Sequence, residues 1–251
     1  MRTLFKGGSV ATGKGVHRAD LLVEGEKVLS LGRGLKDGAD RIIDVSGCVL
    51  FPGFIDAHTH FDLEVAGTVT ADGFASGSRA ALRGGTTTVI DFACPDKGES
   101  LASGLERWRK KAGGKTFCDY GFHMTIDDWN ESIRAELPEM FYQGISSFKM
   151  YMTYPAMLLE DRDLYAALKE LKALGGICGV HCENAGVIDA LIAGKKAAGE
   201  LSPASHPLTR PPYLEAEAVS LLLRVAQAAQ APVIIVHLTN GEALEEVLRA
   251  R

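Results

Sequence analysis

The chain has 251 residues, of which 46% are hydrophobic, so it can bury a large core in one domain or slightly more. Its net charge of −5 excludes the basic surface that nucleic acid or an anionic membrane would need, and no apolar run is long enough to span a bilayer. The five cysteines contain no C-x-x-C pair, and the N-terminus lacks the apolar stretch of a signal peptide. We therefore expect a soluble, cytoplasmic protein without a nucleic-acid or membrane partner.

Residues 1–50 differ in pattern from the rest of the chain. Short apolar pieces such as Leu21-Leu22-Val23 are separated by glycine-rich turns such as Gly32-Arg33-Gly34. This pattern is typical of short strands joined by tight turns. A β-structure of this size is marginal alone, so we expect 1–50 to be part of a small β-domain that is completed or supported elsewhere.

From residue 50 onward, apolar strand-like runs alternate with helix-like segments. The expected strands are 49–57, 86–93, 118–126, 145–152, 176–182 and 232–238. The expected helices are 72–83, 98–112, 128–140, 161–174, 184–198 with 213–230, and 240–250. Strands that are apolar on both faces are typical of a parallel sheet covered by helices, so the alternation predicts an α/β fold.

Two α/β architectures compete for residues 51–251. No G-x-G-x-x-G or P-loop follows any strand, so an open nucleotide-binding sheet lacks its phosphate cradle. Polar residues instead cluster at the C-terminal ends of separate strands, where (β/α)₈ TIM-type barrels place their chemistry. The sequence therefore predicts such a barrel. Only about six βα units are present, whereas a closed barrel has eight.

Four histidines mark three of these strand ends. His58 and His60 project to the same side of the first strand, because alternate side chains of a strand share a face. His181 and His237 are each the first strongly polar residue after an apolar strand. Taken singly, either is more often a core histidine bonded to a backbone carbonyl. Four imidazoles converging on one barrel mouth instead favour a metal site, with zinc as the default and manganese or cobalt as alternatives.

Lys149 lies within an apolar strand, so its charge must be neutralised, paired or modified. One interpretation is a strand-end lysine whose amine reaches solvent. The other is that a lowered pKa lets the amine react with CO₂, giving a carbamate whose two oxygens bridge two metal ions. The residues alone leave both open.

The arrangement of H-x-H on the first strand, lysine on the fourth and histidine on the fifth and sixth resembles the binuclear amidohydrolase superfamily. Longer stretches resemble its hydantoinase and dihydropyrimidinase branch. They are Gly67-Thr68-Val69-Thr70-Ala71-Asp72, Arg83-Gly84-Gly85-Thr86-Thr87-Thr88, His181-Cys182-Glu183-Asn184-Ala185 and His206-Pro207-Leu208-Thr209-Arg210-Pro211-Pro212. The resemblance extends over the whole chain. It implies that 1–50 is the N-terminal part of a small β-sandwich domain and 51–251 an incomplete metal-dependent hydrolase barrel.

The resemblance also implies roles for individual residues. The metal set would be His58 and His60 on the more buried ion, His181 and His237 on the more exposed ion, and carboxylated Lys149 bridging both. A hydroxide held between the two ions would attack the amide carbonyl of a cyclic ureide or imide. Tyr154 would steady the oxyanion, and the residues shaping the substrate pocket would be Tyr154, Leu63, Tyr151 and Leu158.

The implied activity is the opening of hydantoin or dihydropyrimidine rings. Allantoinase and dihydroorotase activities are alternatives, and so is a non-catalytic dihydropyrimidinase-like assembly protein. The family's catalytic aspartate, at the end of an eighth strand, has no counterpart before Arg251. We therefore expect an N-terminal fragment that is inactive alone and belongs to a dimer or tetramer at full length.

Several polar residues near the expected ligands are given a structural role or no role. His123 is interpreted as a packed or barrel-lining residue and Cys182 as a packed one. Asp91 could line the barrel mouth or cap a helix. No role is assigned to Glu183 or Asp62, on the view that strand alternation points them away from the ligands.

Overall fold

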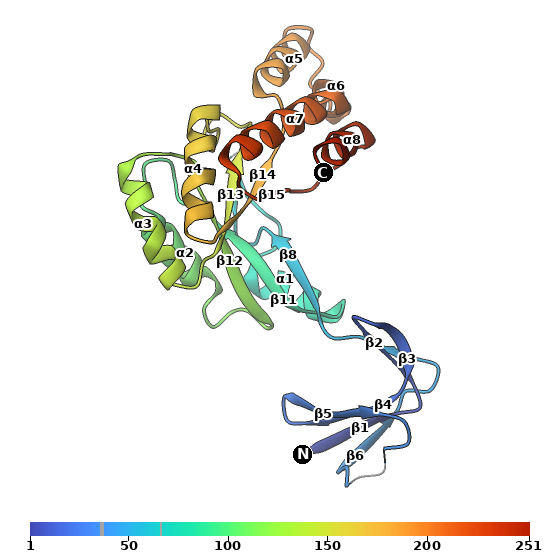
Figure 1. Ribbon diagram of the computed structural model, residues 1–251. Helices are drawn as coiled ribbons and strands as arrows, with labels where there is room; N and C mark the ends of the chain where they lie inside the picture. Colours follow the sequence, from blue (N-terminus) through green and yellow to red (C-terminus); the bar gives the residue numbers. More distant parts are fainter. Residues whose placement is uncertain (36–37, 66) are drawn as a thin grey trace. The chain divides into compact units, whose positions relative to one another are not determined.

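The computed structural model describes residues 1–35, 38–65 and 67–251 (Figure 1). The chain divides into two compact units. One comprises Met1–Ile55 and Arg83–Thr88, and the other comprises Asp56–Leu82 and Val89–Arg251. No helix within the described ranges combines the length and the apolar character needed to cross a membrane.

The first unit is built from two small sheets. A four-stranded sheet has the order β5-β4-β1-β6, in which β1 is antiparallel to β4 and parallel to β6. A three-stranded sheet has the order β3-β2-β7. The strands are β1 (Arg2–Lys6), β2 (Ser9–Thr12), β3 (Gly15–Arg18), β4 (Asp20–Glu24), β5 (Lys27–Gly32), β6 (Arg41–Asp44) and β7 (Val49–Leu50). The expectation of short strands in this part of the chain is confirmed.

The main sheet is parallel, and its strands follow one another in chain order, β15-β14-β13-β12-β11-β8. Its strands are β8 (Phe54–Thr59), β11 (Thr86–Ala93), β12 (Asp119–Thr125), β13 (Ser147–Tyr151), β14 (Ile177–His181) and β15 (Val233–Ile235). A short hairpin of β9 (Glu64–Val65) and β10 (Thr68–Val69) follows β8. This sequential parallel order, with helices between the strands, confirms the α/β barrel architecture with six βα units.

Helices alternate with these strands, and Figure 1 shows α2, α3 and α4 along one face of the sheet. The helices are α1 (Phe74–Arg83), α2 (Leu101–Ala112), α3 (Glu131–Tyr142), α4 (Asp161–Ala173), α5 (Ala185–Ala197), α6 (His206–Thr209), α7 (Pro212–Ala229) and α8 (Gly241–Ala250), with a 3₁₀ turn at Pro203–Ser205. Helix α7 packs against α4 and α8.

Two expected strands are shorter than the sequence pattern indicated. The run 49–57 is divided, because Pro52 and Gly53 interrupt it between β7 and β8. Gly53 is required there, since a Cβ atom would fall 2.0 Å from Thr87 Oγ1. At the other end, the run 232–238 forms a strand only over Val233–Ile235, so His237 lies in the turn that follows it.

The register of the sheet places Lys149 and His181 near the same edge. Lys149 pairs with Thr125 on one side and Gly179 on the other, and Tyr151 pairs with His181. Because the strands are parallel, their carboxyl ends meet at the same edge of the sheet. His181 therefore ends β14 at that edge, while Lys149 lies one pleat inside it.

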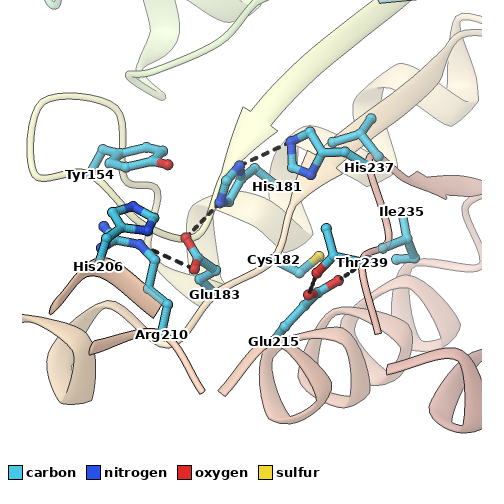
Figure 2. Close-up of a pocket in the computed structure, with 11 residues that line it drawn as sticks. Tyr154, His181, Cys182, Glu183, His206, Arg210, Glu215, Ile235, His237 and Thr239 are labelled. Carbon is cyan, nitrogen blue, oxygen red and sulfur yellow. Dashed lines mark hydrogen bonds and ion pairs between the residues drawn. The ribbon is translucent and has the colours of Figure 1, made fainter. Parts of the chain in front are cut away.

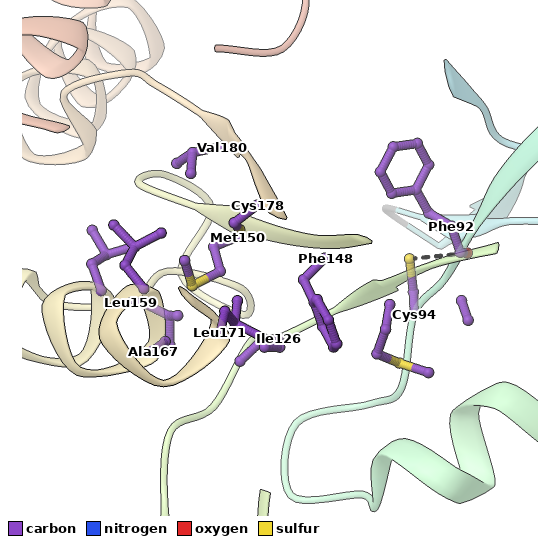
Figure 3. Packing of buried hydrophobic residues seen from close by; sticks show 14 of the residues in the cluster. Phe92, Cys94, Ile126, Phe148, Met150, Leu159, Ala167, Leu171, Cys178 and Val180 are labelled. Atoms are coloured by element: carbon purple, nitrogen blue, oxygen red, sulfur yellow. Dashed lines mark hydrogen bonds between the residues drawn. The ribbon is translucent and has the colours of Figure 1, made fainter. Parts of the chain in front are cut away.

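The core lies between the sheet and the helices that cover it. Figure 3 shows sheet residues such as Phe148, Met150 and Cys178 packed with Leu171 of α4. Helix α4 buries one face, Leu164, Leu168 and Leu171, at the helical spacing expected from the sequence. Lys149 is also among the largest fully buried side chains, but it lies between Phe148 and Met150 on β13 and therefore faces the other side of the sheet.

A glycine of α1 determines how closely that helix approaches the segment after β8. Gly77 is buried, and a Cβ atom there would fall 2.1 Å from Cε1 of Phe61. Replacing Gly77 by alanine should therefore destabilise the chain by about 2 kcal/mol, because overpacking outweighs the better helix propensity of alanine. Urea denaturation followed by circular dichroism measures the change.

Gly194 provides the matched control. It lies inside α5, is exposed, and a Cβ atom there would meet nothing within 4 Å. Gly194→Ala should stabilise the chain by about 0.5–1 kcal/mol through helix propensity alone. Equal effects of the two substitutions would contradict the close packing of Phe61 on α1.

Candidate metal centre

The four predicted histidines come together from three strand ends. Nε2 of His60 lies 3.2 Å from Nε2 of His58, and Nδ1 of His181 lies 3.1 Å from Nε2 of His237. The two pairs are joined through His58 and His237, whose ring centroids are 5.4 Å apart. The histidines thus form one continuous cluster of imidazoles.

Lys149 lies beneath this cluster with its amine shut off from solvent. The residue is 1% exposed, and Nζ donates to the carbonyl of Met150 at 3.3 Å and lies 3.3 Å from the centroid of the Tyr151 ring. Within the described ranges it forms no ion pair. Burial lowers the pKa of Lys149 to about 7. The interpretation of a strand-end lysine reaching solvent is therefore wrong.

Three of the imidazoles, those of His58, His60 and His237, are held neutral. Burial, together with the neighbouring histidines and Lys149, lowers the pKa of both His58 and His60 to about 4. Burial and the adjacent His181 also lower the pKa of His237. Neutral imidazole is the form that binds metal ions. Nδ1 of His60 is, in addition, a buried nitrogen with no hydrogen-bond partner in the described chain.

The donor set is divided into pairs. Among the described residues, no three histidine, cysteine, aspartate or glutamate side chains form a group that could hold a metal ion. Each histidine pair supplies two donors, and the fifth predicted donor is the amine of Lys149. The chemistry of the set therefore fits two ions only if Lys149 is converted into an oxygen ligand that completes both pairs.

A cavity of about 180 Å³ opens beside His181 and His237. Figure 2 shows Tyr154, Glu183 and Arg210 in its wall, around the ring of His181. The ring of Tyr154 meets that of His181 edge-on, with 5.1 Å between centroids. Burial, reinforced by the charge of Glu183, raises the pKa of Tyr154, so its hydroxyl stays protonated and can donate a hydrogen bond.

Backbone strain gathers around this cavity. Tyr154 and His237 both have positive φ, at 67° and 35°. Left-handed backbone costs a non-glycine residue about 1–2 kcal/mol, and such residues persist where the surrounding structure holds them. Among the described residues, Asp62 and Gln230 are the other non-glycine cases, and Gln230 ends helix α7. Strain at Tyr154 and His237 thus coincides with the candidate site.

Glu183 is a site residue that the sequence analysis set aside. Its Oε2 lies 2.8 Å from Nε2 of His181, and its Oε1 lies 3.4 Å from Nε of Arg210 (Figure 2). Alternation did not turn Glu183 away, because a residue two positions after His181 returns to the same side. Burial works to raise the pKa of Glu183, but His181 and Arg210 outweigh it and the pKa is lowered.

Asp91 is more than a cap or a lining residue. It is 1% exposed, and each of its oxygens accepts two hydrogen bonds. Oδ2 accepts from the Phe61 amide at 2.8 Å and from Oγ1 of Thr59 at 3.0 Å, and Oδ1 accepts from the Phe92 amide at 2.9 Å and from Nε1 of Trp108 at 3.0 Å. Burial raises the pKa of Asp91 to about 6, and these four donors limit the rise. Asp91 thereby anchors the backbone on both sides of His60.

The remaining predicted pocket residues lie around the cluster, outside the wall of this cavity. Tyr151 stacks on the ring of His181, with 5.9 Å between centroids, and forms a bridge to Leu158. Leu63 is partly buried against the core after His60. Their assignment to a substrate pocket stays a prediction.

Three other residues have structural contacts. His123 forms hydrogen bonds with Oγ of Ser147 and with the carbonyl of Ala57, which tie β12 to the adjacent β13 and to β8, two strands away in the sheet. Asp62 accepts from the amide of Phe74 at 2.9 Å, at the beginning of α1. Cys182 is buried and packs, as expected.

A six-stranded parallel α/β sheet with histidines and a buried lysine at its carboxyl edge defines a barrel-type protein with a candidate metal centre. Residues 49–237 match the family described as Amidohydrolase family, and the chain belongs to that family. The chain is 41% identical to D-hydantoinase of Geobacillus stearothermophilus over 253 residues, and 37% identical to dihydropyrimidinase of Rattus norvegicus over 257 residues.

The solved structures give the same picture. The crystal structure of dihydropyrimidinase from Brevibacillus agri superposes with a TM-score of 0.97 at 38% identity, covering 100% of this chain and 55% of that one. The two relatives named above are likewise matched by all of this chain but over only 54% and 50% of their own lengths. The chain thus spans about half the length of the curated relatives it matches.

Proposed function

We propose that this chain supplies the metal centre of a metal-dependent hydrolase that opens cyclic amides, with hydantoin and dihydropyrimidine rings as the substrate class. The observation that carries the proposal is the buried amine of Lys149, which has no ion-pair partner in the described chain and lies beneath four histidines. If the amine stayed unmodified and became protonated, it would place an uncompensated positive charge in a site where burial disfavours charge. The names of the relatives, D-hydantoinase and dihydropyrimidinase, support the substrate class.

The residues divide into two ligand pairs. His58 and His60 would hold one ion through the Nε2 atoms that face each other. His181 and His237 would hold the second through Nδ1 and Nε2. Zinc is the first candidate, and manganese or cobalt also suits imidazole and carboxylate donors. When bound, the ions supply Lewis acidity and lower the pKa of water enough to make it a nucleophile at neutral pH.

Lys149 would complete both pairs after reaction with CO₂. Its neutral amine would attack the carbon of CO₂. A nitrogen–carbon bond forms, one π pair moves onto oxygen, and the nitrogen gives up a proton to water or bicarbonate of the medium. The product is a carbamate anion with two oxygen donors, which suits hard divalent ions. A lysine whose pKa is lowered by burial has the neutral amine that this reaction needs.

Tyr154 would act on the substrate. Its protonated hydroxyl lies in the cavity wall beside His181, where it can donate to the oxygen of the ring carbonyl as negative charge develops there. The loop that carries Tyr154 is held by the amides of Met157 and Leu158, which both donate to the Tyr154 carbonyl. This arrangement orients the phenol without placing a charge in the cavity.

The metal proposal is tested by loading the chain with zinc in bicarbonate and measuring metal per chain by elemental analysis. We expect two ions per chain, and a lower melting temperature after chelation because ligands that bind the folded state stabilise it. Turnover of hydantoin and dihydrouracil is then measured on the protein in its natural length.

Three outcomes separate the alternatives. Two ions with ring opening support the proposal. Two ions without turnover of either substrate favour another cyclic amide, allantoin or dihydroorotate, or a non-catalytic role, and so contradict the proposed substrate class. No binding of zinc, manganese or cobalt in the presence of bicarbonate contradicts the ligand assignment itself.

A further inference from the structure

The cavity wall contains a charged pair, Glu183 and Arg210, that lies beside the predicted ligand His181 and is largely shielded from solvent. The side chains of His181, Glu183 and Arg210 are 14%, 15% and 19% exposed, so the contacts among them are largely shielded from water. Oε2 of Glu183 meets His181, and Oε1 meets Arg210. Figure 2 shows the carboxylate lying between the two.

The contact with Glu183 determines which ring nitrogen of His181 carries its proton. An ionised carboxylate only accepts hydrogen bonds, so the nitrogen 2.8 Å away, Nε2, must be the donor. When the ring carries a single proton, that proton is therefore on Nε2, and Nδ1 keeps its lone pair. Nδ1 is the atom that faces Nε2 of His237 at 3.1 Å, inside the histidine cluster.

Arg210 holds the carboxylate in place. It follows helix α6 and precedes Pro211 and Pro212, where the fixed φ of proline limits the freedom of the backbone. Its guanidinium is permanently charged, and its Nε lies 3.4 Å from the oxygen of Glu183 that His181 does not use. The ring of His181 is further confined by the ring of Tyr151, stacked at 27°, and by Tyr154.

We propose that Glu183 and Arg210 are positioning residues that fix His181 in the Nε2–H tautomer and aim Nδ1 at the metal centre. The inference rests on the proposed function, because the direction of the Nδ1 lone pair matters only if a metal ion binds there. Histidine ligands commonly donate their second N–H to a carboxylate, and loss of that partner lowers metal affinity about ten- to hundredfold. Arg210 acts on His181 only through Glu183.

The tautomer is read without any metal. In the metal-free chain with ¹⁵N-labelled histidine, two-bond ¹H–¹⁵N correlation spectra distinguish Nδ1–H from Nε2–H rings, and a His181→Gln sample assigns the signal. We expect Nε2–H for His181. In Glu183→Leu/Arg210→Met, which removes both charges together, we expect a mixture with Nδ1–H. Glu183→Gln, which keeps the shape and leaves a weaker acceptor, should lie between.

Zinc affinity in bicarbonate, measured by competition with a chromophoric chelator, gives the second readout. We expect Glu183→Leu/Arg210→Met to bind about ten- to hundredfold more weakly than the unmodified chain, and Glu183→Gln to lose less. Arg210→Met alone should weaken binding, but adding it to Glu183→Leu should cost nothing further, because the two act as one unit.

Glu170 and Arg134 provide the matched control, since they form an Arg–Glu pair between α4 and α3, at 3.1 Å. Glu170→Leu/Arg134→Met should leave the His181 tautomer and the zinc affinity unchanged. If the role of Glu183 were only structural, Glu183→Leu/Arg210→Met would lower the stability of the chain but leave the His181 tautomer unchanged.

The failures are distinguishable. An unchanged Nε2–H signal in the double variant, or additive losses of affinity, overturns the positioning role while leaving metal binding intact. A changed tautomer in a chain that binds no zinc overturns the proposed metal function, and with it the purpose assigned to the pair.

Discussion

Replacing Lys149 by methionine is expected to reduce the metal content from two ions per chain to at most one, weakly held ion. Methionine has nearly the volume of the lysine stem and is apolar, which suits a fully buried position, so the fold should survive. What is lost is the only predicted donor shared by both histidine pairs. Elemental analysis after loading with zinc and bicarbonate measures the change. With ¹³C-bicarbonate, a carbamate carbon signal should be present in the unmodified chain and absent from the variant.

The metal-free variant gives an independent check on burial. An amine that is 1% exposed with no ion-pair partner in the described chain is costly, and replacing a buried charge by an apolar side chain is often neutral or stabilising by about 1–4 kcal/mol. Lys149→Met should therefore unfold at the same or a higher urea concentration than the unmodified chain. Lys169→Met on the exposed face of α4 is the control and should change neither stability nor metal content. Two ions per chain in Lys149→Met would remove the carbamate from the site.

The fold was predictable where periodicity is strong. Alternation of strands and helices indicated the parallel order of the sheet, because each apolar run and each helical face repeats over several residues. The pattern did not reveal where a strand stops pairing. The run 49–57 is largely apolar, and its division depends on Pro52, on Gly53 and on Thr87, which lies more than thirty residues away.

The site was predictable for residues that end strands. His58, His60, His181 and His237 stand where apolar runs stop, so the topology brings them together once the strands are parallel. Lys149 is conspicuous for the opposite reason, as a charge inside such a run. Tyr154 was recognised only through the family resemblance, because its position depends on a loop with positive φ.

Residues whose partners are remote in sequence were missed or undervalued. Glu183 is held by Arg210, which follows α6, and no local sequence pattern predicts that contact. The donors to Asp91 come from its own strand, from β8 with the residues after it, and from α2, at separations that carry no periodic signal. Glu183 lies just beyond a strand end and Asp91 near one, and in both cases alternation within the strand does not identify the partner.

Asp91→Asn is expected to destabilise the chain by about 3 kcal/mol at pH 8, although the two side chains have the same shape. Each carboxylate oxygen accepts two donors, and an amide replaces one acceptor by an NH₂ group that must then face two donors in the interior. Because Thr59 and Phe61 are released, the backbone around His60 should loosen, and zinc affinity should fall as well. Urea denaturation measures the stability loss.

The indole N–H of Trp108 reports on the same site. It donates to Oδ1 of Asp91 at 3.0 Å, so its ¹H–¹⁵N resonance should move in Asp91→Asn, while the resonance of Trp129 should stay. Asp119→Asn, at an exposed position at the start of β12, makes the same chemical change without these donors and should alter stability by less than about 0.5 kcal/mol. If the two substitutions had equal effects, Asp91 would not be the anchor of the segment that carries His60. If the Trp108 resonance moved but stability did not, the amide would satisfy the donors by rearrangement, and the requirement for four accepted hydrogen bonds would be wrong.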